Sequence, residues 1–447
     1  MIGHQAEVSA AGVGLRRSAG EATGALVRPL GAFERMYHRR QQKSTMHFCM
    51  VAELADDLDP FMLAGGLRAV QQRHPLLNVY VEDHPRTGLG FYRPGFVPPI
   101  PITVSDAEAG RSWRDCVAAE LTRPFGTLCA PMIRVVLLRS EPSTPAAIVL
   151  TVDHVIVDGL SAGYILRDLF AALNGRQLQA LAAPPAQEEL IGVLRDGQPS
   201  AVRAANGQPH TAQPDWLPTP SAVRPFDGAA PHICTVSFDR DLTRRLVARA
   251  RAERTTVHSA LVSAMRRVII ESGRNEFVRM TTANDFRSHI GAHDDVCLYF
   301  TVTRTAFTRE QLTDVWDMAR TVGDQLTGAR SLPAVLAGSA AVEQFIPADA
   351  TTEDAEAFMV AGSALRRSRP TLVSWTWAPE AVRPVAIWGP AILIHVQGEL
   401  NTGVCTFNGQ LRMVTASHHP LPGDHVRDVL DAACPTPTER RPPCESD

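Results

Sequence analysis

The chain has 447 residues, more than the roughly 250–300 that usually share one hydrophobic core, so we expect two domains. Hydrophobic residues make up 45% and charged residues 20% of the sequence, as in ordinary globular proteins. The net charge of −3 excludes the basic face that nucleic-acid binding requires, and short basic pairs such as Arg39-Arg40 and Arg366-Arg367 are expected to be solvated.

The sequence of the N-terminal half predicts a mixture of helices and strands. We expect residues 1–24 to be disordered and a helix to span 56–74, with Asp59 as its N-cap and Pro60 in its first turn. The remaining elements predicted for this half are a strand at 76–83, a helix at 111–125, two adjacent strands at 131–140 and 146–154, and a helix at 161–175 that ends at Asn174-Gly175.

The C-terminal half repeats this outline after a join at 181–231. That join is rich in Pro, Ala and Gln and lacks periodicity, so we expect a linker or crossover instead of a packed element. The pair Asn408-Gly409 predicts a hairpin. The elements predicted for this half are strands at 232–239, 277–286, 297–307, 391–399, 403–409 and 410–417, and helices at 241–254, 256–273 and 424–434.

These elements predict two similar-sized α+β domains, at 25–180 and 232–432, followed by a disordered tail at 433–447. The first 25 residues lack an apolar stretch, and no uncharged apolar run approaches the roughly 18 residues of a membrane span. The eight cysteines include no C-x-x-C pair, which indicates neither a zinc site nor a disulfide framework. We therefore expect a cytoplasmic protein without integral membrane association or bound metal.

The stretch 153–163, DHVIVDGLSAG, permits two interpretations. Gly159-x-Ser161-x-Gly163 follows an apolar run and precedes a helix, as in the nucleophile elbow of serine hydrolases. However, no HGG motif occurs upstream, and the alternation of strands and helices is poor after residue 181. A hydroxyl in the first turn of a helix is the better interpretation of Ser161, and a hydrolase remains the third hypothesis.

The second interpretation is an H-x-x-x-D-G motif formed by His154, Asp158 and Gly159. Its surroundings resemble the HHxxxDG region of nonribosomal-peptide condensation domains and polyketide-associated acyltransferases. Further segments resemble that superfamily in the expected order, across roughly residues 28–430: LRAVQQRHPLLNVYVE, RPFGTLCAPMIRVVLLR, RTTVHSALVSAM, TTANDFRSHI and TFNGQLRMVTAS. This order is far more specific than any single motif.

The resemblance implies an α+β fold of two chloramphenicol-acetyltransferase-like domains, arranged as a V-shaped pseudo-dimer with a tunnel between them. A phosphopantetheine thioester, on coenzyme A or on a carrier protein acting in trans, would enter from one face. A small-molecule acceptor would enter from the other, and the acyl group would pass to its amine or hydroxyl. No permanently bound cofactor is implied. Secondary-metabolite or complex-lipid biosynthesis is the expected setting.

The same resemblance assigns roles to individual residues. His154 is the expected general base, since a neutral imidazole is available near pH 7. Asp158 is expected to be structural and to pair with Arg287, because a buried carboxylate without a partner is costly. Gly159 permits a tight turn, and its amide is a candidate donor to the oxyanion. The further candidates for the tunnel lining are Asp153, Ser161, Asp285 and Ser374.

One position departs from the family pattern. The first histidine of HHxxxDG is replaced by Asp153, a candidate to orient His154 or to raise its pKa. The resembled acyltransferases depend chiefly on the second histidine, so the replacement is compatible with activity. Some condensation-like domains with altered motifs act only as docking platforms. A catalytically silent module that binds a carrier protein is therefore the alternative hypothesis.

Overall fold

The structure is a computed structural model that describes residues 24–105, 112–140, 145–197, 222–272, 277–292, 294–361, 372–375, 382–419 and 423–435. The segments predicted to be disordered, 1–24 and 433–447, lie almost wholly outside the described residues. At the second boundary, however, Cys434 is buried, and the Trp316 indole donates to the carbonyl of Ala433 at 3.0 Å. The packed chain therefore continues slightly beyond the predicted boundary at 432.

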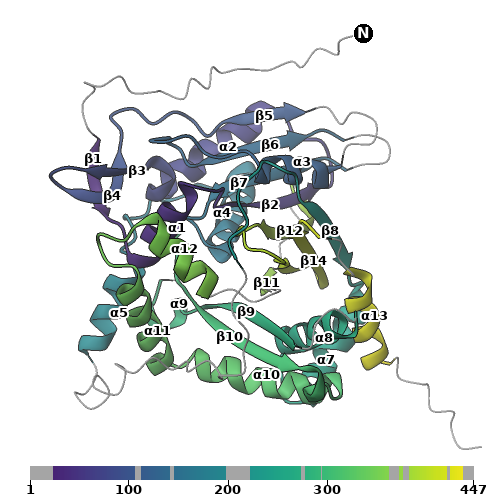
Figure 1. Cartoon of the computed structure of the whole chain (residues 1–447). Helices are drawn as coiled ribbons and strands as arrows, with labels where there is room; N and C mark the ends of the chain where they lie inside the picture. Colours follow the sequence, from purple (N-terminus) through teal and green to yellow (C-terminus); the bar gives the residue numbers. More distant parts are fainter. Residues whose placement is uncertain are drawn as a thin grey trace, which may run out of the picture.

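The first half of the chain builds a mixed sheet covered by helices, in the upper part of Figure 1. Its elements are β1 (Ala25–Pro29), α1 (Ala32–Gln41), β2 (His47–Leu54), α2 (Pro60–Arg73), β3 (Tyr80–His84), β4 (Gly88–Arg93), β5 (Ile102–Ser105), α3 (Trp113–Leu121), β6 (Ile133–Leu138), β7 (Ala147–Asp153), α4 (Gly159–Leu173) and α5 (Gln187–Asp196). Strands β1, β4 and β3 form a separate small sheet.

The second half contributes a four-stranded sheet, β11-β13-β14-β8, and the antiparallel pair β9–β10. Its elements are β8 (His232–Ser237), α7 (Arg240–Ala252), α8 (Val257–Glu271), β9 (Phe277–Asp285), α9 (Arg287–Ile290), β10 (Phe300–Thr308), α10 (Val315–Ala329), α11 (Leu332–Phe345), α12 (Thr352–Ala361), β11 (Leu372–Trp375), β12 (Pro384–Ile392), β13 (Asn401–Phe407), β14 (Gln410–Ser417) and α13 (Gly423–Ala433). Helices α8 and α10 lie beside the β9–β10 pair in the lower part of Figure 1.

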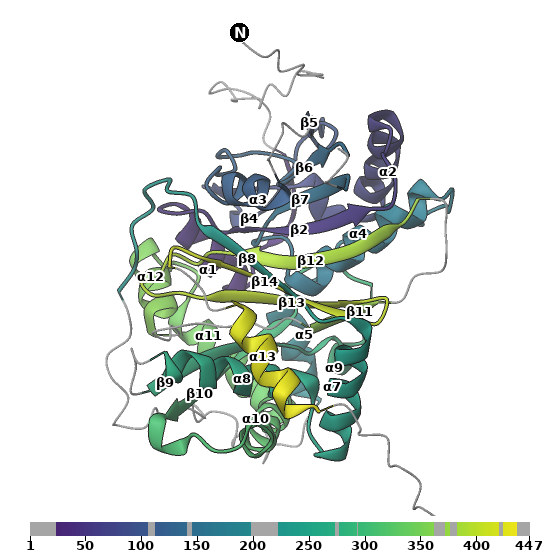
Figure 2. The same ribbon diagram turned by 90° about the vertical axis from the view of Figure 1, so that its right-hand side faces the viewer.

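Strand β12 joins the two halves. It belongs by sequence to the second half, yet it pairs with β2 at the edge of the first half's sheet, in the order β12-β2-β7-β6-β5. Figure 2 shows it running between β2 and the β13–β14 hairpin. The Cys405 thiol of β13 donates to the carbonyl of Gly389 in β12 at 3.1 Å. The predicted unit 232–432 is therefore not structurally self-contained, because one of its strands completes the other sheet.

Helix α5 corrects the expectation for 181–231. It lies inside the predicted linker, and its residues Gln187 and Ile191 are buried. The Gln187 amide oxygen accepts from the backbone N–H of Phe300 at 3.3 Å, and Glu188 accepts from the N–H of Phe33 at 3.0 Å. This part of the join is thus a packed element that connects α1 of the first half to β10 of the second. Residues 198–221 lie outside the described part of the chain.

Most predicted elements are confirmed, and their sequence signals operate as expected. Asp59 caps α2 by accepting from the N–H of Phe61 at 2.6 Å. Asn408 and Gly409 both adopt positive φ, 48° and 76°, as the tight β13–β14 turn requires. The strand predicted at 391–399 is wrong in its bounds: β12 is Pro384–Ile392, because its pairing with β2 ends at Phe48.

The prediction that the pair Arg39-Arg40 is solvated is wrong for Arg40, whose side chain is 1% exposed. It donates to the carbonyl of His395 at 3.2 Å and pairs with Glu356 at 3.4 Å, so it joins α1 to the second half. Arg366 and Arg367 lie outside the described residues.

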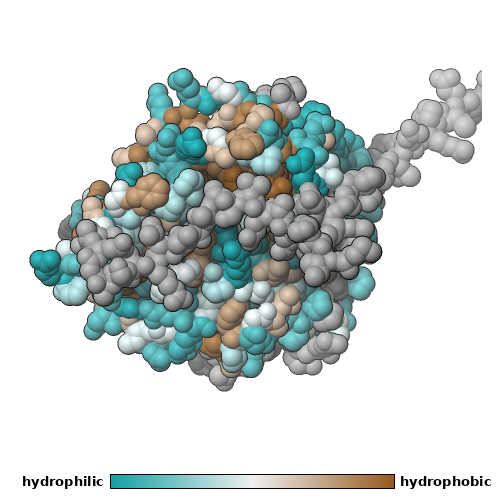
Figure 3. Space-filling view, turned by 90° about the horizontal axis from the view of Figure 1, so that it is seen from above, coloured by the Kyte–Doolittle hydropathy of each residue, from teal (hydrophilic) through white to brown (hydrophobic). Residues whose placement is uncertain are grey.

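No helix in the described ranges is both long and apolar enough to span a bilayer. Viewed from above, much of the coloured surface is hydrophilic, and hydrophobic residues gather mainly in the upper middle of the view (Figure 3).

Candidate active site

His154 directly follows the last residue of β7, at the end of the sheet where β2 begins and β12 ends. In the register, His47 faces Asp153 and Phe48 faces Ile392. The backbone N–H of His154 donates to the carbonyl of Met46 at 2.9 Å, which fixes the chain as it leaves the strand. Three segments that are distant in the sequence therefore meet at this histidine.

Aromatic side chains hold the imidazole in place. Its ring is stacked on that of Tyr37 from α1, with centroids 4.1 Å apart and planes inclined by 22°. Phe48 approaches edge-on at 5.1 Å, and Phe300 lies at 5.9 Å from the opposite half of the chain. His154 is 5% exposed overall. These contacts limit the ring orientations and exclude most bulk water from around it.

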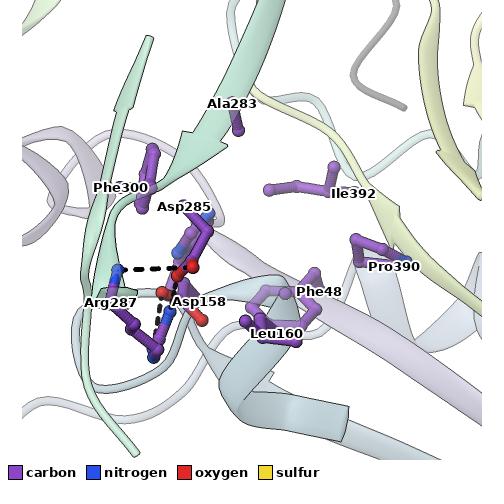
Figure 4. Close-up of a pocket in the computed structure, with 11 residues that line it drawn as sticks. Phe48, Asp158, Leu160, Ala283, Asp285, Arg287, Phe300, Pro390 and Ile392 are labelled. Atoms are coloured by element: carbon purple, nitrogen blue, oxygen red, sulfur yellow. Dashed lines mark hydrogen bonds and ion pairs between the residues drawn. The ribbon is translucent and has the colours of Figure 1, made fainter. Parts of the chain in front are cut away.

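His154 lines a cavity built by both halves of the chain (Figure 4). Helix α4 and strand β2 supply one wall, β9 and β10 supply a second, and β12 supplies a third. The lining is predominantly apolar, with a few polar groups that converge on one side. The lining residues are Phe48, His154, Asp158, Gly159, Leu160, Ala283, Asp285, Arg287, Phe300, Pro390 and Ile392. This composition is typical of small-molecule sites.

Asp158 and Arg287 form the predicted pair, which links the two halves. The Arg287 Nη2 lies 2.9 Å from Asp158 Oδ2, and both side chains are almost fully buried. The carboxylate also accepts from the N–H of Ser161 at 2.7 Å, which makes Asp158 the N-cap of α4, and from the N–H of Tyr299 at 3.0 Å. Burial acts to lower the pKa of Arg287, but the neighbouring carboxylates of Asp158 and Asp285 outweigh it and raise that pKa above its usual value.

Ser161 has a structural environment. It is fully buried, and its Oγ donates to the carbonyl of Cys297 at 2.8 Å. The same Oγ accepts from Arg287 Nη2 at 2.6 Å and from the N–H of Cys297 at 3.1 Å. It is not among the residues that line the cavity. This hydroxyl secures the α4 N-terminus to the second half, and the arrangement does not favour a serine nucleophile.

Asp153 is buried and is not among the residues that line the cavity. Its Oδ1 accepts from the N–H of Val155 at 2.9 Å. With its nitrogen turned toward Asp153, the Gln41 amide donates to both carboxyl oxygens, at 3.0 and 2.9 Å. Burial raises the pKa of Asp153 to about 7, although the Val155 N–H and nearby Arg134 oppose the rise. The described contacts of Asp153 are therefore with Val155 and Gln41, and its predicted place in the tunnel lining stays a prediction.

Gly159 is the first residue of α4 and lines the cavity beside His154. The first amides of a helix have no partner inside the helix, and the helix dipole makes this end partly positive. Asp285 also lines the cavity, at the end of β9. Ser374 lies in β11, and its side chain is outside the described part of the structure. Its predicted place in the tunnel stays a prediction.

Sequence reasoning missed seven residues of the site: Tyr37, which stacks on His154, and the apolar lining residues Phe48, Leu160, Ala283, Phe300, Pro390 and Ile392. Tyr37, Phe48 and Phe300 contact His154 through long-range packing, and no local motif indicates these contacts. The composition of β2 was the available signal for Phe48, because the strand HFCMVAEL is largely apolar and therefore belongs inside a sheet. Within the described residues, no three His, Cys, Asp or Glu side chains gather in a way that could hold a metal ion.

No known family model matches the sequence. Among curated proteins, the chain is 28% identical over 229 residues to a linear gramicidin synthase from Brevibacillus parabrevis, covering 47% of this chain and 4% of that protein. It is 28% identical over 222 residues to the nonribosomal peptide synthetase kk1B of Curvularia clavata, covering 46% and 2%. The matched region is thus a small part of each of these long synthetases.

Solved structures match over nearly the whole chain. Polyketide synthase associated protein 5 from Mycobacterium tuberculosis superposes with a TM-score of 0.63 at 15% identity, covering 94% of this chain and 100% of that one. The first condensation domain of the calcium-dependent antibiotic synthetase gives 0.65 at 12% identity, covering 93% and 98%. The X-domain from teicoplanin biosynthesis gives 0.57 at 13%, covering 91% and 95%.

The chain therefore has the α+β fold of condensation domains. Its relatives in sequence and structure come from nonribosomal-peptide and polyketide biosynthesis, which confirms the predicted resemblance to condensation domains and polyketide-associated acyltransferases. The V-shaped arrangement with a continuous tunnel stays a prediction. At these identities the structural likeness defines the fold but does not define the reaction, which depends on the residues of the site.

Proposed function

We propose that this protein is a condensation-like acyltransferase that moves an acyl group from a phosphopantetheine thioester to an amine or hydroxyl. One observation carries the proposal: His154 faces a predominantly apolar cavity at the junction of both halves, beside the N-terminus of α4. A base, an anion-stabilising helix end and an enclosed space for two reactants are the parts that acyl transfer needs.

In the proposed reaction, the imidazole of His154 accepts the proton of the acceptor N–H or O–H as the acceptor attacks the thioester carbonyl. A C–N or C–O bond forms, the tetrahedral intermediate collapses, and the C–S bond breaks. The imidazolium then returns the proton to the departing thiolate. A positioned base contributes roughly 10²–10⁴ in rate, and holding both substrates in one cavity contributes further through proximity.

The first-turn amides of α4, beginning with Gly159, are the proposed donors to the oxyanion. Asp158 and Arg287 act as positioning residues. Their ion pair fixes the start of α4 relative to β9 and β10, and thereby fixes the amides relative to His154. Ser161 serves the same purpose through its bonds to Cys297 and Arg287. The stacking of Tyr37 on the imidazole orients the base.

The proposed acyl donor is coenzyme A or a carrier protein, with no permanently bound cofactor. The kinship with peptide synthetases and with a polyketide-associated protein supports a carrier-linked thioester. We place the reaction in the cytoplasm. The seven cysteines within the described residues form no disulfide with one another, which is compatible with a reducing compartment. The product then belongs to a biosynthetic sequence that activates acids as thioesters.

A catalytically silent docking module is the second candidate function. The observation that favours it is the position of the first motif histidine, where Asp153 lies buried and does not line the cavity. The fold is also shared with an epimerization domain and an X-domain, so it is not tied to one reaction. Under this alternative, the same surface would bind a carrier protein without transferring its acyl group.

The experiment that separates these candidates is product detection by mass spectrometry. Pooled acyl thioesters, on coenzyme A and on a carrier protein, are offered with pooled amines and alcohols to the wild type, His154→Gln and His258→Gln. His258 is a buried histidine on α8 that does not line the cavity, which makes its variant the matched control. The proposal predicts a product that is lost only with His154→Gln. Undiminished product from His154→Gln would contradict the assigned base, and no product from any pair would favour the docking module.

A further inference from the structure

We infer that the acceptor is an amine on an uncharged apolar skeleton, and that Asp285 selects it by binding its ammonium form. This inference rests on the proposed acyltransferase function and deepens it. It arises from an asymmetry between two carboxylates that share a single arginine at the cavity wall.

The two carboxylates differ in their exposure. The side chain of Asp158 is 6% exposed and that of Arg287 is 3% exposed, whereas that of Asp285 is 40% exposed. Asp285 is the last residue of β9 and faces Phe300 of β10 in the register. In Figure 4 its carboxylate lies at the wall of the cavity, among the apolar lining residues and beside Arg287. Of the two carboxylates, Asp285 is the one that a ligand can reach.

The two carboxylates also differ in how completely they are bonded. Asp158 accepts from two backbone N–H groups besides Arg287, so its oxygens are engaged within the fold. Asp285 Oδ1 meets Arg287 Nη1 at 2.5 Å, and its Oδ2 has one long bond, 3.3 Å from the N–H of Arg287. Each carboxylate oxygen can accept about two hydrogen bonds. Asp285 therefore retains capacity for a donor on a ligand.

The charges of the cavity lining do not balance. Arg287 supplies one positive charge, and Asp158 and Asp285 supply two negative charges, so the ionised lining residues sum to −1 with His154 neutral. Arg330 lies near this strand, but its guanidinium donates to Asn284 at 3.3 Å. The charge of Asp285 still acts on Arg330, opposing the lowering of its pKa by burial, but this arginine does not line the cavity.

A net negative wall in an apolar cavity favours a cation and disfavours an anion, since charges interact strongly where water is excluded. An ammonium group both donates a hydrogen bond to the open oxygen of Asp285 and is attracted to its charge, whereas an alcohol donates a hydrogen bond without that ionic attraction. The remaining lining, which includes Phe48, Leu160 and Ile392, suits an apolar skeleton. A substrate with a carboxylate beside the amine would be repelled.

The proton balance is compatible with catalysis. The bound ammonium releases one proton to solvent and becomes the nucleophilic free amine. As nitrogen attacks the thioester carbonyl, His154 accepts a second proton and passes it to the thiolate. The C–N bond forms, the C–S bond breaks, and the products are an amide, a thiol and one released proton. No oxidant or reductant is needed.

The test uses 2-phenylethylamine and 2-phenylethanol, two acceptors that differ only in the reacting group, with one acyl thioester that the wild type accepts. The measured quantity is the ratio of kcat/KM for the amine to kcat/KM for the alcohol. The wild type should favour the amine, and Asp285→Asn should lower the ratio by about tenfold, since only the amine loses an ionic attraction to this side chain. Most of the change should appear in KM for the amine.

Two further variants keep the test decisive. Asp285→Glu retains the charge and should retain the preference for the amine. Asp294→Asn removes an exposed carboxylate that pairs with Arg167 outside the cavity lining, and should leave the ratio unchanged. A wild-type preference for the alcohol, or an equal ratio in wild type and Asp285→Asn, would overturn the inference even if turnover depends on His154.

A failure of the proposed function gives a different result. If no thioester is turned over, calorimetry measures the binding of 2-phenylethylamine and 2-phenylethanol directly. Binding of the amine that is weakened by Asp285→Asn would support the cation site although the protein does not transfer acyl groups. Absence of amine binding would overturn the inference as well.

Discussion

Asp158 and Asp285 lie on either side of Arg287, and their contrast separates the fixed part of the site from its adjustable part. Asp158 is buried, caps α4 and accepts two backbone N–H groups, so any change to it disturbs the fold. Asp285 is 40% exposed, and its printed bonds are to the guanidinium of Arg287 and, at 3.3 Å, to the backbone N–H of the same residue. The same residue type thus supports the framework at one position and can meet a substrate at the other.

The largest expected effect comes from Arg287→Ala. This change removes the partner of both carboxylates and leaves the charge of Asp158 buried, which typically costs about 3–5 kcal/mol of folding free energy. Urea unfolding followed by circular dichroism measures the loss. A loss below about 1 kcal/mol would mean that the pair is not the fixed part of the site.

Ser161→Ala comes next. The hydroxyl accepts from Arg287 and from the N–H of Cys297, both buried, and loss of such an acceptor costs about 1–3 kcal/mol. Under the acyltransferase proposal, the folded variant still forms product at a temperature well below its unfolding transition. Complete loss of turnover in a folded Ser161→Ala protein would revive the serine nucleophile.

Asp153→Asn should change how the folding stability depends on pH. Because burial raises the folded-state pKa of Asp153 to about 7, the folded protein binds a proton here between about pH 4 and pH 7 that the unfolded chain lacks. Folding stability from this group therefore falls as pH rises through that window, by at most about 1.4 kcal/mol per pH unit. The variant lacks this loss.

The measurement is the difference in unfolding free energy between Asp153→Asn and the wild type at pH 5 and at pH 8. The difference should move in favour of the variant by up to about 2.6 kcal/mol as pH rises. Burial likewise raises the pKa of Glu188 to about 7, but this group is common to both proteins and cancels in the comparison. A difference that is independent of pH would show that Asp153 is ionised throughout.

The smallest expected change in stability is that of Asp285→Asn. Its carboxylate is partly solvated, so neutralising it should alter the unfolding free energy by less than about 1 kcal/mol. Measured in the same unfolding assay, the losses of unfolding free energy in this variant and in Arg287→Ala can be compared directly. A loss as large as that of Arg287→Ala would show that both carboxylates support the fold.

Local signals in the sequence were sufficient for much of the fold. The cap at Asp59, the turn at Asn408-Gly409 and the apolar runs of β6 and β7 each act within a few residues, and the structure confirms them. The pair Asp158–Arg287 was also predicted, although only through the family resemblance. Such features depend on chemistry that neighbouring residues or a known motif display.

The remaining features depend on contacts between distant segments. Nothing near β12 indicates that it completes the sheet of the other half, and that pairing brings Ile392 beside Phe48 and places the strand at 384–392 instead of the predicted 391–399. Arg40 seemed solvated because its partners, Glu356 and the His395 carbonyl, come more than 300 residues later. The stacking of Tyr37 on His154 has the same origin.

The central claim is that His154 is the base of an acyl transfer. The most direct measurement is kcat for one identified thioester and acceptor pair in the wild type, His154→Gln and His258→Gln, with folding checked by circular dichroism. If His154 is the base, kcat falls by about 10²–10⁴ in His154→Gln alone. A folded His154→Gln protein that keeps wild-type kcat would contradict this claim.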